Sequence, residues 1–278
     1  MERSPSFKRR ATELSKKAIV LGIKEAAEHL PLNYSMVGEE YIAEARKLLA
    51  QKKTVVAALD HHGYADLTSG ACVGLKRHFD DLVQYAAIVM SVRYLKNFPT
   101  NFLPEYFNVI PVVPHTMPDY PNREEINRQA IEKAQNIPDG SLLVVTPEGT
   151  SNRQAAMLEV RFGSERFWHG VGERSLIHIA IEGSEEQWPR GLGVAGGGAY
   201  YFAYGRWFKK IKFIFGEPTP VETIDSIAQR LAKNPEDFER LKSEVVMAGI
   251  ARLHIEKGDS KYAGRYADLA RELQKIRD

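Results

Sequence analysis

Six short apolar segments, separated by stretches of helical character, constrain the fold of this chain more than any other feature. They cover residues 55–59, 85–90, 109–113, 142–145, 176–181 and 211–215. Each is rich in Val, Ile, Leu, Ala and Phe, a pattern typical of strands that are buried on both faces of a parallel sheet. Helical stretches such as 67–78 and 123–135 lie between them. We therefore predict an α/β fold: a mostly parallel or mixed sheet flanked by helices on both faces.

An N-terminal helical segment, residues 1–52, is expected to precede the α/β domain, residues 53–278. Residues 4–30 carry apolar side chains at helical spacing among Lys and Arg, which indicates an amphipathic helix. Pro31 ends this helix, and residues 37–51 predict a second one. Two interpretations of the first helix stay open: it packs on the domain with its basic face in water, or it lies on an anionic membrane surface.

The C-terminal part of the domain is expected to be helical. Asn234 and Pro235 form a strong helix start, since Asn caps free amides of the first turn and Pro is favoured at the first helical position. The helix that they open carries an apolar face up to Leu253. Residues 261–278 predict a further, more polar helix at the surface or at an oligomer contact.

His61 and Asp66 are the first candidates for chemistry, because they follow the apolar segment 55–59 where a strand gives way to a helix. Five residues on one helix would place the two side chains about 140° apart, so they would not share a face. His61 is therefore expected before the helix and Asp66 in its first turn, with Gly63 allowing the chain to fold back. A carboxylate on one imidazole nitrogen leaves the other free to take a proton from a hydroxyl. The alternative is that Asp66 only caps the helix.

A second motif, Pro-Glu-Gly-Thr at residues 147–150, follows the apolar segment 142–145. The combination of His-x4-Asp with this downstream motif resembles the glycerolipid acyltransferase family over roughly residues 50–220. The resemblance implies that His61 is the base that deprotonates the acceptor hydroxyl and that Asp66 orients it. It also implies that the residues of the second motif help to bind the acceptor: Glu148, Gly149 and Thr150.

The resemblance implies an enzyme, an O-acyltransferase like those that act on 1-acylglycerol 3-phosphate in phospholipid biosynthesis. Such an enzyme transfers a fatty acyl group from acyl-CoA or an acyl-carrier protein to a hydroxyl of a glycerophosphate-type or lysophospholipid acceptor. No metal and no resident cofactor are implied, because the thioester donor is a co-substrate.

The chain departs from the family pattern at several positions, which affects the expected acceptor. The family commonly has Asn or Ser where this chain has Asp60, and Arg-Ser where it has Ser151 and Asn152. A phosphate favours a planar fork of donors, so two interpretations stay open: Arg153 takes over that role, or the acceptor is not a simple phosphate. Arg93, which follows the segment 85–90, is a further candidate for a phosphate contact, the alternative being a solvated loop charge. The segment 176–181 carries His178 where the family usually has a proline.

Two other functions stay open as alternatives. A catalytically inactive relative that binds lipid or a partner protein would keep the fold and lose turnover. A metal-dependent phosphoesterase is suggested by the triplet Asp60-His61-His62, but two metals need several carboxylates. No Asp precedes Asp60 in the sequence, and the only earlier His is His29.

Composition narrows the partners and the location. The net charge of +2 gives no footprint for nucleic acid, which calls for a clustered basic surface. The single Cys72 excludes an internal disulfide and indicates a reducing compartment. No uncharged apolar run reaches the roughly 18 residues that would span a bilayer. We therefore expect a cytoplasmic protein whose partners are the thioester donor and the lipid or glycerophosphate acceptor, with contact to the inner face of the membrane through the N-terminal helix.

Overall fold

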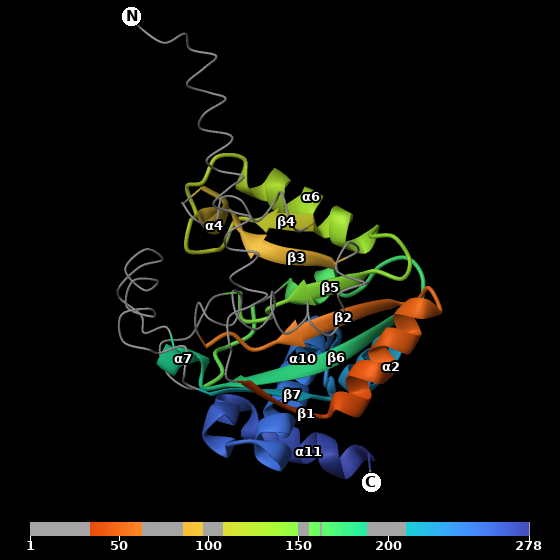
Figure 1. Ribbon diagram of the computed structural model, residues 1–278. Helices are drawn as coiled ribbons and strands as arrows, with labels where there is room; N and C mark the ends of the chain where they lie inside the picture. Colours follow the sequence, from red (N-terminus) through yellow and green to blue (C-terminus); the bar gives the residue numbers. More distant parts are fainter. Residues whose placement is uncertain are drawn as a thin grey trace, which may run out of the picture. The chain divides into compact units, whose positions relative to one another are not determined.

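The structure is a computed structural model that describes residues 34–62, 86–96, 108–149, 156–161, 163–187 and 210–277 (Figure 1). The chain divides into two units between Leu32 and Asn33. The helices expected at residues 4–30 and 67–78 lie outside the described residues.

An eight-stranded sheet forms the centre of the second unit. Its strands are β1 (Tyr34–Val37), β2 (Thr54–Leu59), β3 (Ala86–Ser91), β4 (Asn108–Val112), β5 (Leu142–Val145), β6 (Arg174–Glu182), β7 (Ile211–Phe215) and β8 (Thr219–Pro220). The order is β1-β7-β6-β2-β5-β3-β4, with β8 paired to β6. Strands β6, β2, β5, β3 and β4 are mutually parallel, whereas β7 and β8 run antiparallel to β6 and β1 runs with β7. The predicted mixed, mostly parallel sheet is confirmed.

Helices cover this sheet. They are α2 (Glu39–Ala50), α4 (Val92–Lys96), α6 (Arg123–Gln135), α7 (Ser184–Gln187), α9 (Val221–Leu231), α10 (Pro235–Lys257) and α11 (Ala267–Arg277), with the 3-10 helices η4 (Ser164–Phe167) and η6 (Ser260–Tyr266). The bounds of α6 are those expected from the sequence. Helix α10 begins as predicted, because the Asn234 side chain accepts the N–H of Asp237 and Pro235 occupies the first turn.

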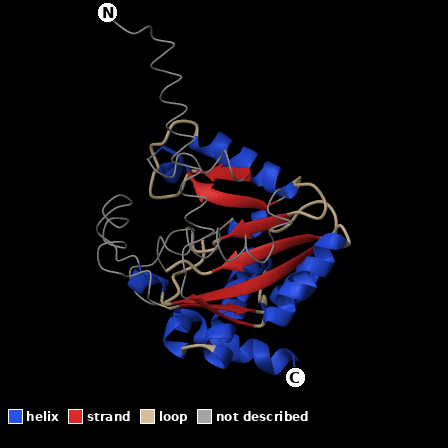
Figure 2. Cartoon of the chain, viewed as in Figure 1, coloured by secondary structure: helices blue, strands red, loops and turns tan. Residues whose placement is uncertain are grey.

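Two apolar cores lie on opposite faces of the sheet, as Figure 2 shows by the helices on both sides. Alternate residues of β2 point to opposite faces: Val56 and Ala58 belong to the core with α9 and α10, whereas Val55 and Ala57 belong to the core with α2. Both sets are fully buried. Strand β2 is therefore central in the sheet and buried on both sides, so its carboxyl end is held firmly.

Residues 34–50, expected from the sequence within the helical segment 1–52, contribute β1 and α2 to the sheet unit. Strand β1 pairs in parallel with β7, with Met36 opposite Phe213. Helix α2 buries Ile42, Ala45 and Leu49 against the sheet. Pairing with a strand that is distant in sequence explains why β1 was not expected.

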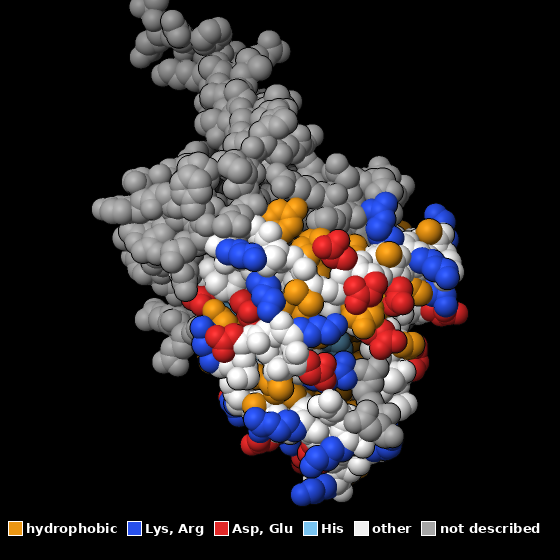
Figure 3. Space-filling view, turned by 60° about the horizontal axis from the view of Figure 1, so that its bottom comes forward, with side chains coloured by type: hydrophobic (Ala, Val, Ile, Leu, Met, Phe, Trp, Pro, Cys, Tyr) orange, Lys and Arg blue, Asp and Glu red, His pale blue; other side chains and the backbone are white. Residues whose placement is uncertain are grey.

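Two features of the described residues relate to the expected membrane contact: the length and apolar character of the helices, and the distribution of charge on one face of the surface. None of the helices in the described ranges is both long and apolar enough to cross a membrane. On the face shown in Figure 3, basic and acidic side chains of the described residues are interspersed.

Candidate functional site

The two motifs of the sequence meet at one edge of the sheet. Strands β2 and β5 are parallel neighbours, with Ala58 paired to Val145. His61 and Glu148 each lie three residues beyond this pair, so they leave the sheet at the same edge. The two residues are close in space, because the backbone N–H of His61 lies near enough to the Glu148 carboxyl to help lower its pKa.

Glu148 is fully buried at this edge. One carboxyl oxygen, Oε1, accepts the backbone N–H of Leu158 at 2.9 Å. Burial is the main cause that raises the pKa of Glu148 to about 8, and the negative charge of Asp60 adds to it. The hydrogen bonds from Leu158 and His61 act in the opposite direction. The side chain is therefore mostly a neutral acid at neutral pH, and its hydrogen bond ties the Glu-Gly motif to the backbone of Leu158.

Gly149 allows a tight turn directly after Glu148. Its φ of 64° lies in the left-handed region that favours glycine, and its N–H donates to the carbonyl of Thr146 at 2.9 Å. A Cβ at this position would lie 3.1 Å from Cγ of Arg161, so the stem of Arg161 packs over the glycine. The Arg161 N–H in turn donates to the carbonyl of Pro147 at 3.1 Å. The structure thus brings an arginine that the sequence did not single out onto the Glu-Gly motif.

A further cation and an imidazole lie near Arg161. The pKa of His115 is lowered, first by burial and then by the positive charges of Arg161 and Arg123. His115 follows β4. Arg123 begins α6 and Arg161 follows the Glu-Gly motif, so two separate parts of the chain supply positive charge near this imidazole. Among the described residues no carboxylate forms an ion pair with Arg123 or Arg161. These side chains would attract an anionic group.

A buried cluster of charged side chains surrounds the other side of the His61 segment. Oδ2 of Asp60 accepts hydrogen bonds from Nε2 of His62 at 2.8 Å and from Nε2 of His254 at 2.6 Å. Oδ1 of Asp60 accepts the backbone N–H of Ile181 at 2.9 Å. All three side chains are completely buried. Burial by itself would raise the pKa of Asp60, but the charges and hydrogen bonds of the two imidazoles hold it far below its usual range.

His254 also bonds to a second carboxylate. Its Nδ1 lies 3.0 Å from Oε1 of Glu182, the residue that ends β6, and the same oxygen accepts the N–H of Asp259 at 2.6 Å. Burial alone would lower the pKa of His254, but Asp60 and Glu182 hold it above its ordinary value. The ring of Tyr262 stacks on His254, with centroids 5.2 Å apart and an interplanar angle of 20°.

Asp60, His62 and His254 are also residue types that bind metals, and their donor atoms all lie within 4.8 Å of one another. Nitrogen and oxygen ligands about 2.0 Å from a tetrahedral zinc would be about 3.3 Å apart. The separations of 2.6 and 2.8 Å at Oδ2 of Asp60 are shorter and match charge-assisted hydrogen bonds. The arrangement fits a hydrogen-bonded ion network better than a set of metal ligands.

The other residues expected at the site have varied positions. His61 is buried, with 3 % of its surface exposed. Arg93 is exposed on α4, immediately after the carboxyl end of β3. Asp66, Thr150 and Arg153 lie outside the described residues. His178 lies within β6 against Gly249 of α10.

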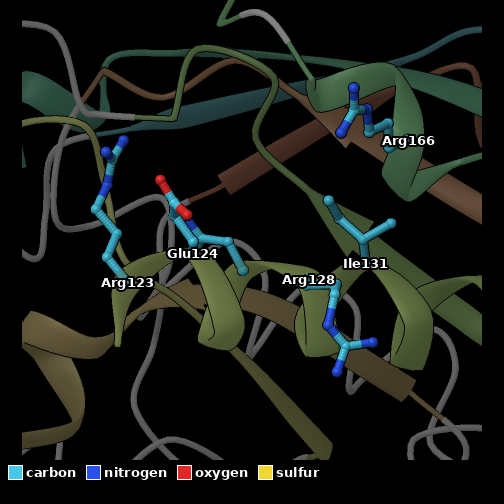
Figure 4. A pocket seen from close by; sticks show the side chains of 6 residues that line it. Arg123, Glu124, Arg128, Ile131 and Arg166 are labelled. Atoms are coloured by element: carbon cyan, nitrogen blue, oxygen red, sulfur yellow. The ribbon is translucent and has the colours of Figure 1, made fainter. Parts of the chain in front are cut away.

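A separate pocket of about 340 Å³ lies between α6 and η4. Figure 4 shows Arg123, Glu124, Arg128 and Ile131 on α6, and Arg166 facing them from η4. Arg128 is already paired with Glu125 and Glu132, at 2.7 and 3.2 Å. Neither His61 nor the residues of the Glu-Gly motif line this pocket.

The chain matches no protein-family model, and no curated protein matches it. The resemblance to acyltransferases therefore rests on the two motifs themselves.

Proposed function

We propose that this chain is an O-acyltransferase that uses His61 as a general base to pass a fatty acyl group from a thioester to an alcohol. The observation that supports it most is that the two motifs meet: His61 and Glu148 leave the paired strands β2 and β5 at the same edge, with the His61 backbone close to the Glu148 carboxyl. Parallel sheets of this kind bind ligands at the carboxyl ends of their strands. Each motif alone is a weak signal, and their contact in space is what a shared site requires.

The proposed reaction needs one base and no covalent intermediate. The His61 ring takes the proton of the acceptor hydroxyl while the hydroxyl oxygen attacks the thioester carbonyl carbon. A C–O bond forms, the C–S bond breaks, and the imidazolium returns the proton to the departing thiolate. The sequence has no Ser or Cys beside His61, which agrees with direct attack by the acceptor. Asp66 is proposed to orient the His61 ring.

The acceptor proposed here carries a phosphate, as glycerol 3-phosphate and lysophosphatidate do. The arginine stem that packs on Gly149 supports this, because it places a cation beside the Glu-Gly motif. Arg161 joins the residues proposed from the motifs for the acceptor: Glu148, Gly149, Thr150, Arg153 and Arg93. The donor is proposed to be an acyl thioester on coenzyme A or a carrier protein, and the N-terminal helix is proposed to contact the membrane surface.

The test is a transfer assay with purified protein. Palmitoyl-CoA and palmitoyl carrier protein are each offered with glycerol 3-phosphate, lysophosphatidate or monoacylglycerol, and ester products are identified by mass spectrometry. General-base catalysis contributes about 10²- to 10⁴-fold, so His61→Gln should lower the rate by that factor. Thioester loss without an ester product would indicate hydrolysis instead, and lipid binding without turnover would favour the inactive relative.

His169→Gln is the matched control for this assay. Nε2 of the His169 ring lies 3.0 Å from Oδ1 of Asp225. The backbone carbonyl of His169 accepts a hydrogen bond from Arg174, the residue at the start of β6. The start of β6 lies at the edge of the parallel strands opposite to His61. Loss of an imidazole there should leave the transfer rate unchanged.

A further inference from the structure

His254 is a buried imidazole whose two nitrogens both face carboxylate oxygens. Nε2 lies 2.6 Å from Oδ2 of Asp60, and Nδ1 lies 3.0 Å from Oε1 of Glu182. Ionised carboxylates only accept hydrogen bonds, so both ring nitrogens of His254 carry hydrogens in this arrangement. A fully buried ring that donates on both sides cannot turn without breaking a charge-assisted bond.

Asp60 transmits this constraint to the residues on both sides of His61. Its Oδ2 accepts from His254 and from His62, and its Oδ1 accepts the backbone N–H of Ile181 in β6. The residues before and after His61 are thus fixed by side-chain bonds, and the backbone N–H of His61 lies near the Glu148 carboxyl. Each residue of the segment 60–62 therefore has neighbours that limit its movement.

The surroundings of Glu182 are built to let it reach His254. A side chain at Gly258 would collide with Oε1 of Glu182, so glycine is needed there for close approach. The N–H of Asp259 donates to the same oxygen, and Lys212 lies 3.7 Å from Oε2. The ring of Tyr262 covers both His254 and His62, with centroids 5.2 Å from each. The end of α10 and the start of η6 therefore enclose the pair.

We propose that His254 is a positioning residue for His61: by joining Asp60 to Glu182, it holds the segment 60–62 in the orientation in which the His61 ring meets the acceptor. This inference rests on the proposed function. His254 is completely buried, so the role assigned to it is to position His61 and not to contact substrate. It makes α10, far away in sequence, part of the active site.

A positioning role differs in its effects from a purely structural one. A misplaced base lowers kcat while KM changes little, because the acceptor contacts are made by other residues. Misplacement by about 1 Å can cost about 100-fold in rate. We therefore expect His254→Gln, in which the amide can donate to only one carboxylate with good geometry, to lower kcat at least about 10-fold per folded molecule.

The experiment compares His254→Gln with Ile250→Ala in the full chain. Ile250 is fully buried on the same helix, so its truncation weakens α10 packing without touching Asp60. We expect kcat to fall in His254→Gln and to hold in Ile250→Ala, both measured per folded molecule. The double variant Asp60→Asn/His254→Gln replaces the ion pair with two amides, and we expect it to recover part of the lost kcat. An unchanged kcat in His254→Gln, with wild-type turnover intact, would overturn the positioning role and leave the proposed function standing.

A second readout does not depend on turnover. The ring resonances of His61, followed by ¹H–¹⁵N NMR, should shift in His254→Gln and stay in place in Ile250→Ala. If the wild type transfers no acyl group, the proposed function fails, and this comparison still decides whether His254 positions His61: unchanged resonances would overturn the inference. Stoichiometric binding of Zn²⁺ that His254→Gln abolishes would instead assign the cluster to a metal and would also overturn it.

Discussion

Replacing Glu148 with Gln should make the protein more stable than the wild type, and this difference in the free energy of unfolding should grow as the pH rises. Burial and the charge of Asp60 raise the pKa of Glu148 from 4.5 to about 8 in the fold. A group whose pKa is raised by folding contributes stability that is fully present below its unfolded pKa and lost as the pH rises through its folded pKa. The wild type therefore loses stability between about pH 4.5 and pH 8 through this one carboxyl.

The size of the effect follows from the shift of the pKa. At 1.36 kcal/mol for each unit, the free energy of unfolding falls by about 3 kcal/mol between pH 4 and pH 7 and by nearly 5 kcal/mol above pH 8. Gln keeps an oxygen that can accept the N–H of Leu158, and it has no charge to bury. The variant should lack this loss, so its stability relative to the wild type should rise by these amounts.

Urea unfolding followed by circular dichroism at pH 5, 6, 7 and 8 measures the difference. Glu159→Gln is the matched control, because Glu159 is 63 % exposed and its ion pair with Arg265, at 3.0 Å, is a surface pair that adds little to stability. Effects of pH on the rest of the chain cancel when each variant is compared with the wild type. The difference in the free energy of unfolding between Glu148→Gln and the wild type should grow from pH 5 to pH 8. A difference that stays constant or falls would refute the claim that burial and Asp60 raise the pKa of Glu148.

Two further substitutions test the packing and the charge coupling around the site. Gly249→Ala should lower the free energy of unfolding by about 1–3 kcal/mol, because the new methyl would collide with the buried ring of His178. In an exposed helix the same change raises the free energy of unfolding by about 1 kcal/mol. A gain in thermal stability would contradict the contact between Gly249 and His178. Asp60→Asn should lower the pKa of Glu148 towards its ordinary value by removing a nearby negative charge; an unchanged carboxyl titration by ¹³C NMR would show that the two groups are not coupled.

The elements of the fold that could be predicted from the sequence are those with local signals. Strands β2 and β5 are continuous apolar runs, and α6 matches its predicted range. The start of α10 was predicted because Asn234 and Pro235 both favour a helix start. Strand β1 was missed, since its four residues are only half buried and owe their conformation to pairing with β7. Contacts with distant strands are not visible in local patterns.

The residues of the candidate site also fall into those that could be predicted from the sequence and those that could not. The meeting of His61 and Glu148 could be predicted, because both follow buried strands and the carboxyl ends of parallel strands share an edge. His254 and Glu182 could not, because the helix and the strand that carry them show no motif at these positions. The signal was a histidine among the mostly apolar buried residues of α10, which also include Lys242 and Ser243. Arg161 gave no signal at all, since its place on Gly149 depends on a turn of the chain.

The rate of acyl transfer by His61→Gln, relative to wild type at equal concentrations of folded protein, tests the proposed function most directly. We predict an ester product from the wild type and a rate at least about 100-fold lower in the variant, as expected for loss of a general base. Equal rates in the two proteins, or no ester from the wild type with any of the donors and acceptors, would contradict the proposal that His61 is the base of an acyltransferase.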